Sequence, residues 1–206
     1  DGAKKVSELE TLVDQYEDEL GTYLVKLSRQ NLSVHDSHTL SIVLHCIGDF
    51  ERISDHAINI MEAAQEMHNK KLTFSPKAEE ELKVFCRAVQ DIVEKAYAVF
   101  RDQDEKLAQK VEPLEAVVDD LNQEVKKRHI RRLRNGKCTI ELGFILSDIT
   151  TSLERVADHC SNIAVCVTQV RDDTYDTHGY LNSVKNEDSE IFRGLVLEAE
   201  GKYLLP

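Results

Sequence analysis

Apolar side chains recur every three or four residues along most of this chain, and that spacing is typical of amphipathic helices. Ser7, with Glu10 three residues later, has the pattern of a capping box, so the first helix is expected to begin there. Ser75-Pro76 predicts another helix start and Asn135-Gly136 a helix stop. The expected helices are 7–30, 38–69, 76–101, 105–134 with a kink or restart at Pro113, 139–170 and 188–203.

Residues that interrupt helices are few, because the 206 residues include only eight glycines and three prolines. Long helices joined by short turns pack antiparallel, so the predicted fold class is all-α, an antiparallel helix bundle. No apolar run reaches the roughly 18 to 20 residues that a bilayer crossing needs. The chain starts with Asp1 rather than methionine, so we expect either a domain taken from a longer protein or a chain trimmed at its start.

The net charge of −12 argues against nucleic acid as a partner, because the phosphates of a duplex would repel such a body. The five cysteines are an odd number without a C-x-x-C pair. This fits neither the disulfide framework of a secreted protein nor a zinc knuckle. Reduced thiols that pack as small apolar groups are therefore expected, in a cytoplasmic protein.

Self-comparison reveals an internal repeat. Residues 51–60 (ERISDHAINI) and 154–163 (ERVADHCSNI) are identical at six of ten positions. Upstream, LETLVD at 9–14 matches LEAVVD at 114–119 at four of six positions. Two pairs of matching segments in the same order along the chain indicate a duplicated helical hairpin.

Many of the residues that the two copies share are acids rather than apolar core residues. They form four E-x-x-x-D pairs: Glu10 with Asp14, Glu51 with Asp55, Glu115 with Asp119, and Glu154 with Asp158. Residues four apart lie on one face of a helix, roughly 6 Å from each other. Each pair lies about 20 residues from the turn of its hairpin, or roughly 30 Å at 1.5 Å per residue. Four carboxylates can therefore converge in each copy.

Acids so placed repel one another unless positive charge lies between them, and burial makes this worse. They are either solvated surface acids, partners of Arg52 and Arg155, or ligands of metal ions. Oxygen ligands favour hard cations over zinc. Iron is the favoured ion, with manganese, magnesium, calcium and zinc as alternatives.

Other polar residues near the acids have secondary roles. Asn59 and Asn162 lie one turn beyond Asp55 and Asp158, as outer ligands or hydrogen-bond partners. Arg52 and Arg155 belong to the same outer group. His56 and His159 are expected to pack rather than to bind metal.

At these residues the chain resembles the PhoU family, whose signature reads approximately D-x-E-R-x-x-D-x-x-x-N-I. Residues 49–60 match it, and residues 152–163 match it except that Ser152 replaces the first aspartate. The resemblance implies two tandem three-helix bundles in which the E-x-x-x-D pairs hold multinuclear metal clusters. We therefore expect one repeat at 1–72 that lacks its first helix, a second repeat at 73–172, and a tail at 173–206.

The resemblance also implies a non-enzymatic domain that regulates phosphate uptake. The chain is most similar to the C-terminal cytosolic domain of bacterial sodium/phosphate cotransporters, at the inner face of the plasma membrane. Its partner would then be the membrane domain of the same chain or a phosphate transporter, with a homo-oligomer as a further expectation. Alternatives are a free-standing regulator of a phosphate ABC transporter and its sensor kinase, a carboxylate-bridged phosphohydrolase, and a purely structural bundle.

One basic cluster stands apart from the acids: Lys126, Lys127, Arg128, Arg131, Arg132 and Arg134. Cations near a helix C-terminus favour its dipole, so a solvated face is the simple interpretation. Contact with anionic lipid or phosphate is the alternative. No P-loop motif and no Glu-x-x-His motif of a di-iron bundle is present, which removes two enzyme classes.

Overall fold

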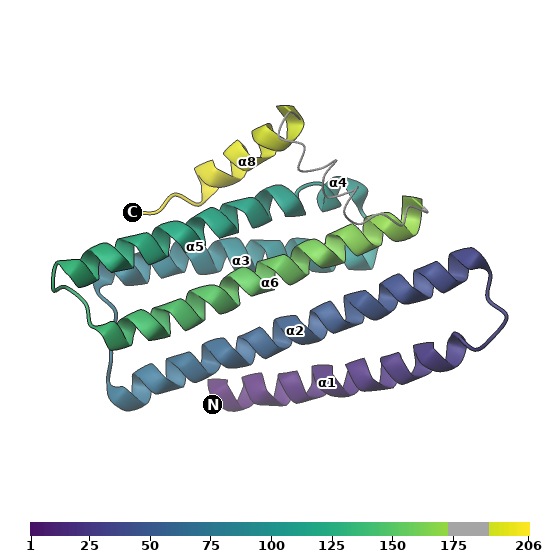
Figure 1. Ribbon diagram of the computed structural model, residues 1–206, viewed down its shortest axis with the longest axis horizontal. Helices are drawn as coiled ribbons and strands as arrows, with labels where there is room; N and C mark the ends of the chain where they lie inside the picture. Colours follow the sequence, from purple (N-terminus) through teal and green to yellow (C-terminus); the bar gives the residue numbers. More distant parts are fainter. Residues whose placement is uncertain (173–189) are drawn as a thin grey trace.

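The computed structural model describes residues 1–172 and 190–206 and is helical throughout, without a β-strand in those ranges (Figure 1). The predicted all-α bundle is therefore confirmed. Its helices are α1 (Gly2–Leu27), α2 (Val34–Lys70), α3 (Pro76–Asp102), α4 (Glu105–Ala108), α5 (Val111–Arg134), α6 (Ile140–Asp172) and α8 (Glu190–Lys202). None of them is long and apolar enough to span a bilayer. The start of the last expected helix, residue 188, lies outside the described residues.

Local signals place several helix ends correctly. The Ser75 hydroxyl accepts a hydrogen bond from the Ala78 N–H at 3.4 Å, and Pro76 follows in the first turn. Helix α5 begins at Val111, so Pro113 lies in its first turn, as the predicted restart requires. The chain leaves α5 through Gly136, whose φ of 65° is unstrained only for glycine.

Two predicted starts are wrong. Helix α1 begins at Gly2, and the Ser7 hydroxyl donates to the Ala3 carbonyl at 3.3 Å inside the helix instead of capping it. Helix α2 begins at Val34, because Ser33 caps it by accepting from the Asp36 N–H at 3.0 Å. Both helices therefore begin about one turn earlier than expected, and α1 also ends three residues before the expected position, at Leu27.

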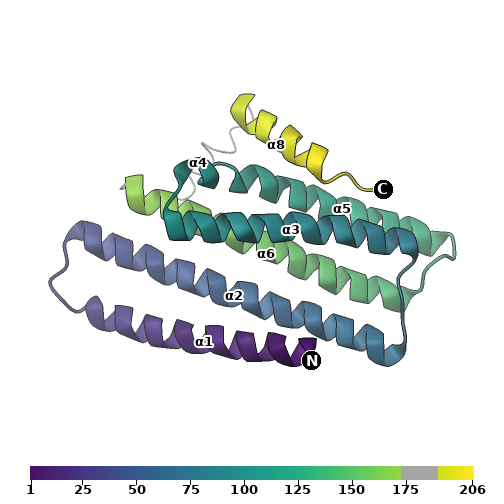
Figure 2. The ribbon, with the colours of Figure 1, turned by 180° about the vertical axis from the view of Figure 1, so that it is seen from behind.

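Helix α6 lies at the centre of the bundle. It packs against α2 on one side and against α3 and α5 on the other, while α1 and α8 occupy opposite edges (Figures 1 and 2). The largest buried side chains include Phe85 and Ile92 of α3, Val118 of α5, and Leu146 and Ile163 of α6. The core thus lies mainly among α3, α5 and α6.

The two copies of the hairpin differ in how well they are covered. Helix α1, all of which is described, contains no buried residue and packs chiefly against α2. The equivalent helix α5 is covered by α3, α6 and α8. Exposed fractions at matched positions are 51% for Leu9 against 3% for Leu114, 45% for Leu12 against 2% for Val117, and 58% for Tyr16 against 6% for Leu121.

This contrast bears on the expected missing helix. Within the described residues, the first hairpin has no neighbour in the place that α3 takes beside the second. The division of the chain at residues 72 and 172 itself stays a prediction.

Leu9 and Leu114 offer a repeat-matched test of this packing. Leu114→Ala is expected to cost about 2–5 kcal/mol of unfolding free energy, because it leaves a cavity in the core. Leu9→Ala is expected to cost less than about 1 kcal/mol, because its side chain is half exposed. Urea unfolding followed by circular dichroism measures both. Equal losses would show that Leu9 is covered in solution.

Candidate functional site

The second copy brings three of its four predicted acids together. Glu115 and Asp119 of α5 and Asp158 of α6 place one carboxylate oxygen each within 4.8 Å of one another. Glu115 is buried, and the other two are half-buried. Oxygen ligands at such spacing suit a hard cation, with water completing its coordination.

Glu154, the fourth acid, lies close enough to these carboxylates to be repelled by them. Burial raises its pKa, and the neighbouring carboxylates of Asp158 and Asp119 raise it further. Arg155 offsets part of this charge, because it pairs with Asp158 at 3.1 Å. Pairing of Arg155 with an acid, one of the alternatives left open by the sequence, is therefore present, although the arginine is more than half exposed and screened by water.

In the first copy of the hairpin the acids lie farther apart as a group. Burial raises the pKa of Glu51, followed by repulsion from Asp55, Asp14 and Glu17. Among the described residues, no three acids of this copy lie as close together as those of the second. The acids of both helices nevertheless face one another.

The α1 side of this group differs in detail from the prediction. Glu10 lies on the half-buried stripe that faces α2, whereas Asp14 is exposed. Glu17 lies on that same stripe and was absent from the predicted set. The repeat does not mark Glu17 as an acid, because its counterpart in the second copy is Asn122, which is buried.

The two histidines pack across the contact between α2 and α6. His159 Nδ1 lies 2.8 Å from Asp49 Oδ1, and its ring stacks on His56 with centroids 5.7 Å apart. The expectation of packing histidines agrees with this geometry. Asn162, one turn beyond Asp158, also donates a hydrogen bond to Asp49 at 3.3 Å and so connects α6 to α2.

Two pockets are lined by residues of α2 and α6, and the repeat relates them. One, of about 410 Å³, is lined by Asp49, Arg52 and Asn162. The other, of about 460 Å³, is lined by the counterparts Ser152 and Asn59, together with His56. Arg52 and Asn59 were expected as outer partners of the E-x-x-x-D acids, and in the structure each lines one of these pockets. The replacement of an aspartate by Ser152 makes the pockets chemically unequal.

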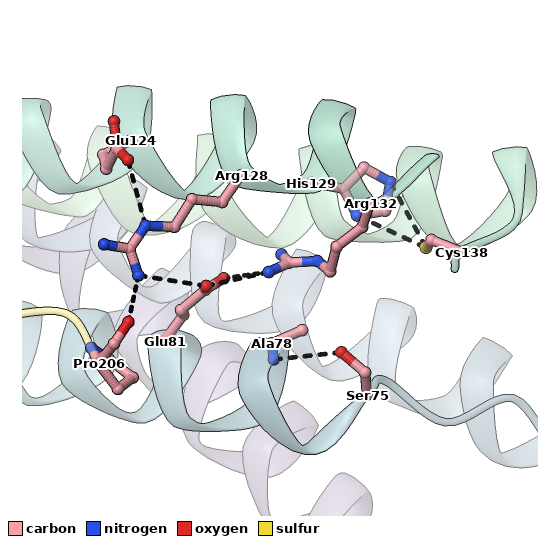
Figure 3. A network of polar contacts seen from close by, with 9 residues as sticks. All are labelled: Ser75, Ala78, Glu81, Glu124, Arg128, His129, Arg132, Cys138 and Pro206. Atoms are coloured by element: carbon pink, nitrogen blue, oxygen red, sulfur yellow. Dashed lines mark hydrogen bonds and ion pairs between the residues drawn. The ribbon is translucent and has the colours of Figure 1, made fainter. Parts of the chain in front are cut away.

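The basic cluster is partly internal. Glu81 of α3, 3% exposed, accepts from Arg132 at 2.8 Å and from Arg128 at 3.4 Å (Figure 3). Arg128 also bonds to Glu124 and to the carbonyl oxygen of Pro206. These contacts hold α3 and the end of the chain against α5.

The remaining cations of the cluster are placed differently. Lys126 donates to Thr151 at 3.1 Å, and Lys127 pairs with Glu124 at 3.4 Å. Arg131 and Arg134 are exposed. A contact with lipid or phosphate would therefore fall to the exposed cations, because Arg128 and Arg132 already balance Glu81.

Comparison with known proteins gives a consistent result. The family model described as "PhoU domain" matches residues 1–64 and 82–167. PhoU homolog 1 of Thermotoga maritima, a phosphate-specific transport system accessory protein, is 26% identical over 97% of this chain and 80% of its own length. A PhoU homolog of Synechocystis with the same description is 27% identical over 81% of this chain and 73% of its own. The crystal structure of PhoU from Pseudomonas aeruginosa superposes with a TM-score of 0.77, at 24% identity, over 84% of this chain and 82% of that one.

The raised pKa of Glu154 predicts a pH-dependent stability. The folded state binds this proton more tightly than the unfolded state, so the ionised carboxyl destabilises the fold as pH rises through its folded pKa. In chelator at pH 7, Glu154→Gln is expected to raise the urea midpoint above that of the wild type. The difference should vanish below the unfolded pKa of 4.5.

Glu124 supplies the opposite control on α5. Its pKa is lowered by the hydrogen bond from Arg128, so Glu124→Gln is expected to lower the midpoint at pH 7. A Glu154→Gln chain no more stable than the wild type at pH 7 would contradict the crowding of acids at this site.

Proposed function

Because this chain belongs to the PhoU family, we propose that it regulates phosphate transport and acts in the cytoplasm without catalysing a reaction. The observation that carries the proposal is the family match over both hairpins, each of which contains the paired acids. The relatives from Thermotoga and Synechocystis, both accessory proteins of phosphate-specific transport systems, support a transport system as the partner.

Metal binding is the finer part of the proposal. The triad of Glu115, Asp119 and Asp158, with Glu154 beside it, has the oxygen donors and the excess negative charge that a hard cation neutralises. A bound ion would remove the repulsion between α5 and α6 and so fix their spacing. Iron remains the favoured ion. The equivalent site of the first hairpin would use Glu51 and its acidic neighbours.

The kind of transporter is a separate question. The relatives favour a free-standing regulator over the cytosolic tail of a sodium/phosphate cotransporter, which was the first expectation from the sequence. We therefore put the free-standing interpretation first and keep the cotransporter tail as the second. The two differ in whether sodium drives the uptake that is regulated.

Elemental analysis tests the metal site. Protein loaded with iron or manganese and then desalted is expected to retain stoichiometric metal, and Glu115→Gln/Asp119→Asn is expected to lose the ion of the second copy. The matched control is Glu94→Gln/Asp120→Asn, which removes the same charge from exposed positions of α3 and α5. If the wild type holds no metal after loading, the metal proposal is wrong. If the double mutant keeps as much metal as the wild type, the ligands are residues other than Glu115 and Asp119.

Phosphate uptake tests the regulatory role independently of metal. In cells that lack their own PhoU-type regulator, expression of the chain is expected to restrain uptake of radiolabelled phosphate at high external phosphate. An effect limited to sodium-dependent uptake would support the cotransporter interpretation. Uptake that is unchanged with and without sodium would contradict the regulatory proposal, whatever the metal content.

A further inference from the structure

Two cysteines from different helices meet at the contact between α2 and α6. The helices run antiparallel, and Asp49 of α2 accepts a hydrogen bond from Asn162 of α6. One turn back from Asp49 is Cys46, and one turn on from Asn162 is Cys166, so the same register brings the two thiols together. All five cysteines of the chain are free thiols.

The two thiols have different environments. Cys46 is 1% exposed, whereas Cys166 is half-buried and lines the pocket of about 410 Å³. The interaction between the two thiols lowers the pKa of Cys166 and raises that of Cys46, and burial of Cys46 raises its pKa further. Cys166 is thus the accessible thiol that can attack a reagent, and Cys46 is the buried second thiol beside it.

The pocket gives a reagent access to only one of them. His45 and Arg52 line it together with Cys166. Asp49 lines the same pocket but is already bonded to His159 and Asn162, so the guanidinium of Arg52 and the imidazole of His45 favour small reagents that carry carboxylates. The position equivalent to Cys166 in the other pocket is Ala63, so the thiol chemistry belongs to this pocket and not to its counterpart.

We propose that Cys46 and Cys166 form a reversible disulfide across the α2–α6 contact, with a low-molecular-mass disulfide such as oxidised glutathione as the oxidant. The Cys166 thiolate attacks one sulfur of the oxidant, breaks its S–S bond and releases one glutathione thiolate. Cys46 then loses its proton to solvent, attacks the Cys166 sulfur of the mixed disulfide and releases the second glutathione. Two protein thiols are oxidised, and one oxidant disulfide is reduced to two thiols.

Such a bond would join the two repeats covalently. The α1–α2 hairpin is held to the rest of the chain chiefly through α2 and α6. A link at Cys46 lies one turn from Asp49 and so next to the contact with His159. The oxidised chain would therefore keep the hairpin in place even where the packing around it loosens.

The experiment uses the full chain, reduced and then equilibrated in glutathione buffers of increasing oxidised fraction. Mass spectrometry without reductant is expected to show the loss of two hydrogens and a linked peptide pair containing Cys46 and Cys166. The thermal midpoint of the oxidised protein is expected to rise by about 5–10 °C. Dithiothreitol should reverse both changes.

Single variants separate the steps. Cys46→Ser is expected to lose the link and trap one glutathione on Cys166, whereas Cys166→Ser should lose both the link and the adduct. The control Cys138→Ser, at a half-buried position in the turn before α6, should keep the link. Circular dichroism of each variant checks that it is folded.

Two results would overturn the proposal. One is a wild type in which Cys138 is fully glutathionylated while Cys166 remains reduced. The other is a Cys46→Ser chain, helical by circular dichroism, whose Cys166 takes up no glutathione. Both are read directly from peptide masses and do not depend on metal or on phosphate uptake.

Discussion

Helix α6 packs against α2, α3 and α5, and burial of its apolar side chains is the interaction through which the two hairpins become one bundle. A helix buried on several sides has little surface left for polar residues. The acids at Glu154 and Asp158 therefore lie in the remaining stripe, where they meet α5. The same constraint forces the histidine and asparagine that follow them to find partners on α2.

The duplication explains why polar groups recur in pairs, and divergence explains why the pairs are unequal. His56 and His159 stack on each other where the two copies meet, but they differ in hydrogen bonding. His159 Nδ1 lies 2.8 Å from Asp49, whereas His56 Nδ1 is buried and has no hydrogen-bond partner among the described residues. At the position that matches Asp49 the second copy has Ser152. At this position one copy thus has an aspartate that bonds across to α6, and the other has a neutral hydroxyl.

Much of the fold could be predicted because helix periodicity, Ser75-Pro76 and Asn135-Gly136 are local signals. The start of α1 was missed because a serine followed by glutamate has the same pattern inside a helix as at its beginning. The buried pair of Glu81 with Arg132 was missed for another reason. Those residues are 51 positions apart, and the sequence does not show which acid of α3 faces α5. The acids Glu115, Asp119 and Asp158 were found because the repeat marks them, whereas Glu17 has no counterpart of its own type.

Unequal coverage of the two hairpins has a consequence for how the chain opens. Local unfolding takes place most easily where few apolar contacts are lost, and segments that lose them together open as one cooperative unit. Helix α1 rests on a single main neighbour and leaves Leu9, Tyr16 and Tyr23 more than half exposed. The α3–α5–α6 core is then the most stable part of the molecule. Helix α1 is therefore expected to open at a lower free energy than the whole chain, while α2 stays packed against α6.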